Sequence, residues 1–156
     1  MILNVMCEIK KNVAYTDPDN GKKYTAVSGI NILKLVDDDG NDVAENTSKV
    51  LWAGSGSPYP TPPGGPWETK YFDHHPRFGK SFQVLTPLES DVMLHRANEL
   101  SYGCFIVSPG SAGDEFFNLL VKNRAGLYVT QSVNDVRSVA DMDANPIDYE
   151  KIGRIG

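Results

Sequence analysis

The chain has 156 residues, the size of one domain, and 40% of them are apolar, which is enough for a packed core and excludes a wholly disordered chain. Its 15 basic and 20 acidic residues give a net charge of −5, which argues against a nucleic-acid partner because phosphate binding needs clustered cations. No apolar run approaches the roughly 20 residues of a transmembrane helix, so we expect no membrane span. The 14 glycines and 10 prolines favour strands and turns over a helical bundle.

The N-terminal segment does not have the pattern of a signal peptide. It has no basic start, and Asn4 and Glu8 interrupt its apolar stretch. Cys7 and Cys104 could form one disulfide, which is too few to scaffold a small secreted fold. We therefore expect a protein that is cytoplasmic in its producer, or that reaches the periplasm through a specialised secretion system.

The first third of the chain predicts strands joined by tight turns. Apolar and polar residues mix in a way that indicates strands at residues 1–10, 23–27 and 30–36, separated by turn signals at 17–21 and 37–41. The acidic turn Asp37-Asp38-Asp39-Gly40 suggests calcium as an alternative, but it lacks the ligand spacing and closing glutamate of an EF-hand loop. A solvated turn is the better interpretation.

The remainder predicts a proline-rich loop, further strands and one helix. Residues 54–66 hold five prolines and four glycines, which excludes a helix or a central strand and indicates an ordered surface loop. Strands are expected at 49–53, 67–72, 80–85, 91–95, 105–107 and 127–133. A helix is expected at 112–123, with Ser111 as its cap, Asp114 near its start and Gly126 just beyond its end. The sequence predicts a mainly β (α+β) fold of one domain, residues 1–156, with one or two helices.

The most informative residues for chemistry are His95 and Cys104. His95 ends one apolar run, and Cys104 begins another nine residues later, after the turn Ser101-Tyr102-Gly103. Neighbouring strands could set the two side chains together at one end of a sheet, where a neutral imidazole can take the thiol proton. Gly103 permits a tight turn whose amides, with that of Cys104, could face an oxyanion. Ser101 could bond the imidazole or a substrate carbonyl.

Each of these residues also has a plain structural interpretation. A single cysteine at the start of an apolar strand is usually a small buried hydrophobe, and a single histidine is usually structural. What favours chemistry is their joint spacing around the Ser-x-Gly-Cys turn.

The run Ser101-Tyr102-Gly103-Cys104, with His95 upstream, resembles the active-site signature of the L,D-transpeptidases. That signature usually has a His-Gly pair followed by Ser/Thr-His-Gly-Cys-x-Arg/Asn. Here Tyr102 replaces the second histidine, Ile106 stands where Arg or Asn is usual, and Arg96 and Ala97 stand where the first glycine is expected.

A divergent branch of the family, the L,D-transpeptidase-like effectors of type VI secretion, is more similar. The resemblance includes the Leu94-His95 and Ser101-x-Gly103-Cys104 pieces, the Gly/Ser and Pro/Gly turns at 54–57 and 62–66, and the segment 78–82. It covers about residues 50–123, which would form the catalytic half.

This resemblance implies a β-sandwich-like domain that acts on peptidoglycan stem peptides without a cofactor. Cys104 would be the nucleophile, His95 the general base and then acid, Ser101 an orienting group, and Gly103 part of the oxyanion hole. Water or an amine would resolve a thioester, which gives carboxypeptidase or transpeptidase activity. An effector or a phage-encoded protein would need no signal peptide of its own, and an immunity protein would be a plausible partner.

Three other residues are candidates for binding the substrate. Arg96 could grip a carboxylate through two hydrogen bonds, although an ordinary exposed arginine is the commoner role. Tyr102 and His75 could contact the peptide, with Trp67, Tyr71 and Phe72 as groove-lining or core residues. A zinc site from His74, His95 and Cys104 is the metal alternative, but no Cys-x-x-Cys or His-x-x-x-His pattern supports it, so we expect no metal.

Two alternatives remain open for the function. One is a non-catalytic binding module on the same scaffold, which the altered positions Tyr102 and Ile106 suggest. The other is a cysteine peptidase of unrelated fold. Papain-like peptidases place the cysteine before the histidine, whereas all three histidines here precede Cys104, and the short spacing is unlike that of sortases.

Overall fold

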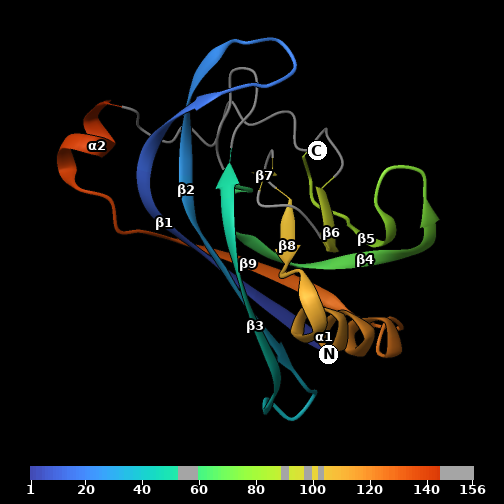
Figure 1. Cartoon of the computed structure of the whole chain (residues 1–156). Helices are drawn as coiled ribbons and strands as arrows, with labels where there is room; N and C mark the ends of the chain where they lie inside the picture. The colour runs from blue at the N-terminus through green and yellow to red at the C-terminus, as the bar shows by residue number, and fades with distance from the viewer. Residues whose placement is uncertain (53–59, 89–91, 97–99, 102–103, 145–156) are drawn as a thin grey trace.

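The structure of the chain is a computed structural model that describes residues 1–52, 60–88, 92–96, 100–101 and 104–144. Within these ranges it has nine strands and two helices (Figure 1). Their bounds are β1 Ile2–Thr16, β2 Lys23–Val36, β3 Asp42–Trp52, β4 Gly64–His75, β5 Gly79–Val84, β6 Val92–Arg96, β7 Leu100–Ser101, β8 Phe105–Val107, α1 Gly110–Lys122, β9 Tyr128–Asp135 and α2 Val139–Ala144.

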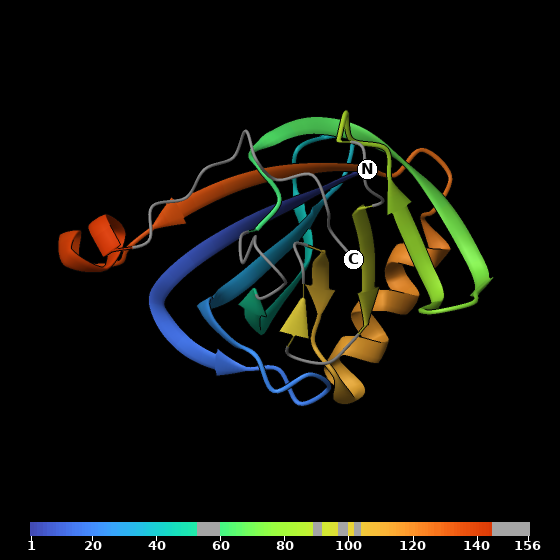
Figure 2. The same cartoon turned by 90° about the horizontal axis from the view of Figure 1, so that it is seen from above.

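The described strands form one continuous hydrogen-bonded series in the order β7-β3-β2-β1-β9-β4-β5-β6-β8. The chain first builds the antiparallel meander β1–β2–β3, and β9 later joins β1 in parallel. The long strand β4 pairs with β9 and then with β5, so the series bends over at β4 into two layers (Figures 1 and 2). β8, at one end of the series, comes to lie over β2 and β3.

Alternation of buried and exposed residues explains the long hairpin of β1 and β2. Leu3, Val5, Cys7 and Ile9 are buried while their neighbours in sequence are more exposed, as expected for a strand with one face on the core. An aspartate that accepts backbone N–H groups closes the turns of the β1–β2 and β2–β3 hairpins: Asp17 Oδ1 accepts from Asp19, and Asp37 Oδ1 accepts from Asp39 and Asn41.

Helix α1 packs against β3, β8 and β5. It buries Phe116, Phe117 and Leu120, and the ring of Phe117 meets that of Phe82 on β5 edge to face, with 5.7 Å between centroids. Since burying a large apolar side chain contributes roughly 1.5–3 kcal/mol, these contacts fix the helix against β5 and β8.

The predicted mainly β (α+β) class is confirmed. Most expected strands are present, but the first three are longer than predicted: β2 runs without a break through residues 28 and 29, and β3 starts seven residues earlier than expected. The two-residue strand β7 was not predicted. Neither described helix is long and apolar enough to cross a membrane.

The predicted helix cap was wrong. Helix α1 begins at Gly110 after an extended Pro109, no side chain caps it, and Ser111 lies inside its first turn. Asp114 pairs with Arg96 on β6 instead of serving the helix N-terminus. Tertiary pairing thus outweighs the local capping preference here.

The proline-rich loop was predicted too long at its C-terminal end. Residues 53–59 of it lie outside the described residues, but β4 already begins at Gly64 and includes Pro66. A proline is tolerated there because the pairing of β4 with β9 is irregular between Gly64 and Trp67.

Candidate functional site

His95 lies on β6 with its ring inside the protein. Only 4% of the residue is exposed, and its Nδ1 is 3.0 Å from the carbonyl oxygen of Arg96. Since a carbonyl can only accept, Nδ1 carries the proton of a neutral ring and Nε2 is the basic nitrogen. His95 is therefore arranged to accept a proton through Nε2.

The surroundings of His95 keep the ring neutral. Burial lowers its pKa below the ordinary 6.5, the hydrogen bond to the Arg96 carbonyl opposes this, and the nearby Arg77 and His75 lower the pKa further. At neutral pH the imidazole is thus a free base. That is the protonation state a general base requires.

Three aromatic rings continue from His95 toward the surface. The ring of Phe78 stacks on His95 with centroids 4.2 Å apart and planes 27° apart, and His75 lies 5.2 Å beyond Phe78. His75 also meets Phe72 edge to face at 5.4 Å. Phe78 belongs to the turn between β4 and β5, so this turn brings its ring onto His95. The amino-acid sequence marks Phe78 only as part of the segment 78–82 and carries no signal for this contact.

Cys104 lies immediately before β8 and is 1% exposed. β6 and β8 are parallel, with His95 level with Ile106, and Cys104 precedes Ile106 by two residues. Because side chains two apart along an extended chain share a face, continuing the alternation of β8 back to Cys104 puts it on the face of Ile106 and His95. Cys104 is then offset by two residues from the level of His95.

The strand register therefore puts Cys104 two residues away from the level of His95. Neither cysteine is in a disulfide. Tyr102 and Gly103 lie outside the described residues, as does the predicted oxyanion turn that includes them. Ser101 is paired through its backbone with Trp52 on β3.

The structure gives Arg96 and His75 structural partners. Arg96 Nη2 donates to the carbonyl oxygen of Gly110 at 3.2 Å and Nη1 pairs with Asp114, so Arg96 binds β6 to the start of α1. It follows His95 directly and so points to the opposite face of the strand.

Nδ1 of His75 accepts the backbone N–H groups of Arg77 at 3.1 Å and Phe78 at 3.3 Å. These two bonds make His75 part of the β4–β5 turn.

The other residues considered for a metal or a groove are separated. His74 is 90% exposed and pairs with Asp73 at 3.1 Å, away from His95. Over the described part of the chain, no three His, Cys, Asp or Glu side chains gather as metal ligands would. Tyr71 packs on Phe82, with 5.1 Å between ring centroids.

A row of buried polar groups crosses the sheet behind β8. Ser48 on β3 donates to the carbonyl oxygen of Ile106 at 2.7 Å, and its register neighbour on β2 is Asn31. Cys7 on β1 donates to Asn31 Oδ1 at 2.9 Å and accepts from Gln131 Nε2 on β9 at 2.8 Å. This row fixes β8, and hence Cys104, against the first layer.

The second cysteine is not a candidate nucleophile. Burial raises the pKa of Cys7 to about 12, although the hydrogen bond from Gln131 lowers it. Its sulfur is held between Asn31 and Gln131 as a neutral thiol. Cys7 is thus a structural residue, and it offers an internal reference for Cys104.

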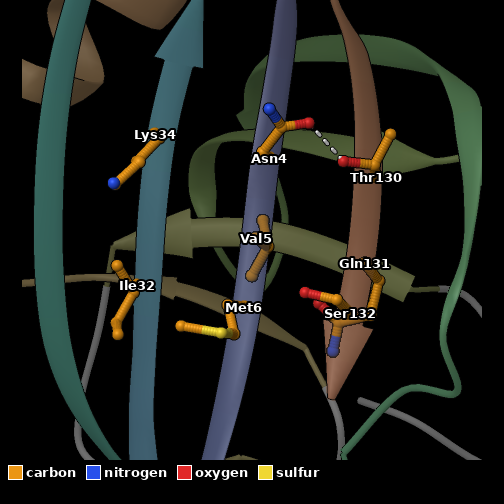
Figure 3. A pocket seen from close by; sticks show the side chains of 8 residues that line it. All are labelled: Asn4, Val5, Met6, Ile32, Lys34, Thr130, Gln131 and Ser132. Atoms are coloured by element: carbon orange, nitrogen blue, oxygen red, sulfur yellow. Dashed lines mark hydrogen bonds between the residues drawn. The ribbon is translucent and has the colours of Figure 1, made fainter. Parts of the chain in front are cut away.

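A hollow of about 360 Å³ lies on the outer face of β1, β2 and β9 (Figure 3). Its rim carries polar side chains, including Lys34 and the hydrogen-bonded pair Asn4 and Thr130, and Met6 and Ile32 supply apolar surface. These side chains alternate with the buried ones of the same strands. The hollow is therefore on the side of the sheet away from the core and does not include His95 or Cys104.

Comparison with known proteins identifies no relative: no family model, curated protein or solved structure matches the chain.

Proposed function

We propose that the protein is a cysteine-dependent enzyme like the L,D-transpeptidases and L,D-carboxypeptidases, acting on the stem peptides of bacterial peptidoglycan. The observation that carries the proposal is a buried, neutral His95, with Nδ1 occupied by a carbonyl and Nε2 basic, on the same face of adjacent strands as Cys104. The similarity of Ser101-x-Gly103-Cys104 to the family signature supplies the substrate class.

In the proposed reaction, His95 Nε2 takes the proton of the Cys104 thiol. The thiolate attacks the carbonyl carbon of the diaminopimelate residue, and the tetrahedral oxyanion is held by backbone N–H groups. The resulting imidazolium returns the proton to the amine of the departing D-alanine, which leaves a thioester on Cys104. Water then releases the acid, or an amine forms a new amide, with His95 again moving the proton.

Access to the thiol is the condition that the structure sets on this reaction. Cys104 is 1% exposed and His95 is 4% exposed. The peptide must therefore displace the chain that covers them before sulfur and carbonyl carbon can meet at reacting distance. Once covered by substrate, the same pair would react out of contact with bulk water.

The test is release of D-alanine from tetrapeptide-bearing muropeptides, followed by mass spectrometry of the products. The wild-type protein should release it, and Cys104→Ala should not. Cys7→Ser is the matched control: it replaces the other buried cysteine, keeps a hydroxyl between Asn31 and Gln131, and should retain activity. An inactive wild type, or an active Cys104→Ala, would reject the proposal.

The burial of Cys104 favours a second candidate, a non-catalytic binding module on this scaffold. In that case Cys104 is one of the small apolar residues of the core. The module predicts a native thiol that does not react with iodoacetamide at neutral pH. Rapid labelling of Cys104 that is lost on replacing His95 would exclude it.

A further inference from the structure

The ring of Phe78 covers His95 from a different part of the chain. Phe78 precedes β5, and its ring stacks on that of His95 at 4.2 Å between centroids. β5 pairs with β6 so that Ser81 is level with His95. The stacked pair thus joins the β4–β5 turn to the middle of the candidate site.

His75 holds the turn that carries Phe78. Its Nδ1 accepts the backbone N–H groups of Arg77 and Phe78, and its ring is braced edge to face by Phe72. The guanidinium of Arg77 lies 5.2 Å from the centroid of Phe78. Phe78 therefore has a fixed backbone and aromatic or cationic neighbours, which limit the orientations of its ring.

We propose that Phe78, on its His75-capped turn, is a positioning residue for His95: it holds the imidazole in the orientation that bonds Arg96 and keeps water from the stacked face. This inference rests on the proposed function, in which His95 is the base. Without Phe78, the ring could rotate about χ2 and exchange its bond to the Arg96 carbonyl for water. Nε2 would then no longer have one fixed orientation.

The charged and titratable groups near His95 also favour the neutral form of its ring. The turn contributes Arg77 and His75, both of which disfavour a positive charge on the ring. The register neighbours on the flanking strands, Ser81 on β5 and Ile106 on β8, carry no charge. Loss of Phe78 would let water solvate the imidazolium, so the protonation midpoint of His95 should rise.

The test is a pH titration of the His95 ring by NMR in the wild-type protein, Phe78→Ala, Phe78→Leu and Phe78→Tyr. We expect the His95 midpoint to lie below 6.5 in the wild type and in Phe78→Tyr, which keeps the stacked ring. It should rise toward 6.5 in Phe78→Ala, and Phe78→Leu should fall between, since it fills space without stacking. Tyr128→Ala removes an exposed ring on β9, which β4 and β5 separate from β6, and should leave the midpoint unchanged.

An unchanged His95 midpoint in folded Phe78→Ala and Phe78→Leu would overturn the inference. If Phe78→Ala does not fold, Phe78→Leu decides alone. The rate of Cys104 alkylation at pH 7 provides a second readout, with a loss of up to about 100-fold expected in Phe78→Ala and recovery in Phe78→Tyr. The NMR midpoint of His95 does not depend on the reactivity of the thiol. An unreactive Cys104 in the wild-type protein would therefore count against the proposed function, whereas the NMR titration alone would decide whether Phe78 positions His95.

Discussion

The contact between helix α1 and the end of β8 can be tested with a single methyl group. Gly113 is buried in α1, and a Cβ at this position would lie 1.6 Å from the carbonyl oxygen of Ser108. Ser108 follows β8 and is itself bonded twice to Asn46 on β3, at 2.8 and 3.0 Å. Gly113→Ala therefore pushes the helix against a backbone segment that β3 holds in place.

The size of the effect follows from one stabilising and two destabilising contributions. Alanine favours the helical backbone by about 0.5–1 kcal/mol over glycine. The new carbon and the oxygen must separate by about 1.8 Å to reach an ordinary contact, and overpacking of this kind costs about 1–3 kcal/mol. Loss of an Asn46–Ser108 hydrogen bond adds about 1 kcal/mol. We expect a net loss of about 1–3 kcal/mol, or a Tm lower by roughly 2–10 °C.

The assay is denaturant unfolding followed by tryptophan fluorescence, with a thermal scan alongside. Asn118→Ala is the matched control, because it makes the same gain in helix propensity on the exposed side of α1. It should be neutral or slightly stabilising. If Gly113→Ala unfolds at the wild-type denaturant concentration or above it, the close approach of α1 to Ser108 does not exist.

Three further outcomes follow from the ionisable groups. Asp135→Asn weakens the pair with the buried Arg137 and should cost about 1–3 kcal/mol of unfolding free energy at pH 7. Because Arg137 lowers the pKa of Asp135 below 3.8, the difference in unfolding free energy between the wild type and Asp135→Asn should vanish as the pH falls through that lowered pKa. Cys7, whose pKa is about 12, should remain unlabelled by iodoacetamide at pH 9 in the native protein and become labelled in denaturant. Since the pKa of folded His95 lies below 6.5, the folded state binds fewer protons at this residue than the unfolded state does. The unfolding free energy should therefore fall as the pH drops below 6.5. His95→Gln should remove the part of this decline that is due to His95.

Local sequence patterns were sufficient to predict where strands lie in the chain, but not how long they are or which strands pair with one another. Alternation located β1 and β2, and the turn residues located the hairpins. Alternation alone does not say which face is inside: over residues 30–35 of β2 the buried residues are Asn31, Leu33 and Leu35, whereas Ile30 and Ile32 are more exposed. A polar residue thus occupies an inner position, and its reason, the bonded row with Cys7 and Gln131, comes from two other strands.

The sequence indicated that His95 and Cys104 lie on neighbouring strands, but not how the two residues are arranged. The spacing of His95 and Cys104 correctly indicated neighbouring strands, but the offset of two residues depends on the parallel register of β6 and β8. Arg96 was considered for substrate binding, and its partner Asp114 is on a helix that packs on the other face. The stacking of Phe78 on His95 depends on a turn 17 residues earlier in the chain, which no local pattern encodes.

The most direct test of the central claim is the rate at which the Cys104 thiol is alkylated at pH 7, measured by mass spectrometry with Cys7 in the same molecule as the reference. If His95 activates Cys104, the wild-type Cys104 reacts faster than Cys7, and His95→Gln slows it by at least about tenfold. A Cys104 that reacts no faster than Cys7, or at the same rate with and without His95, would contradict the account.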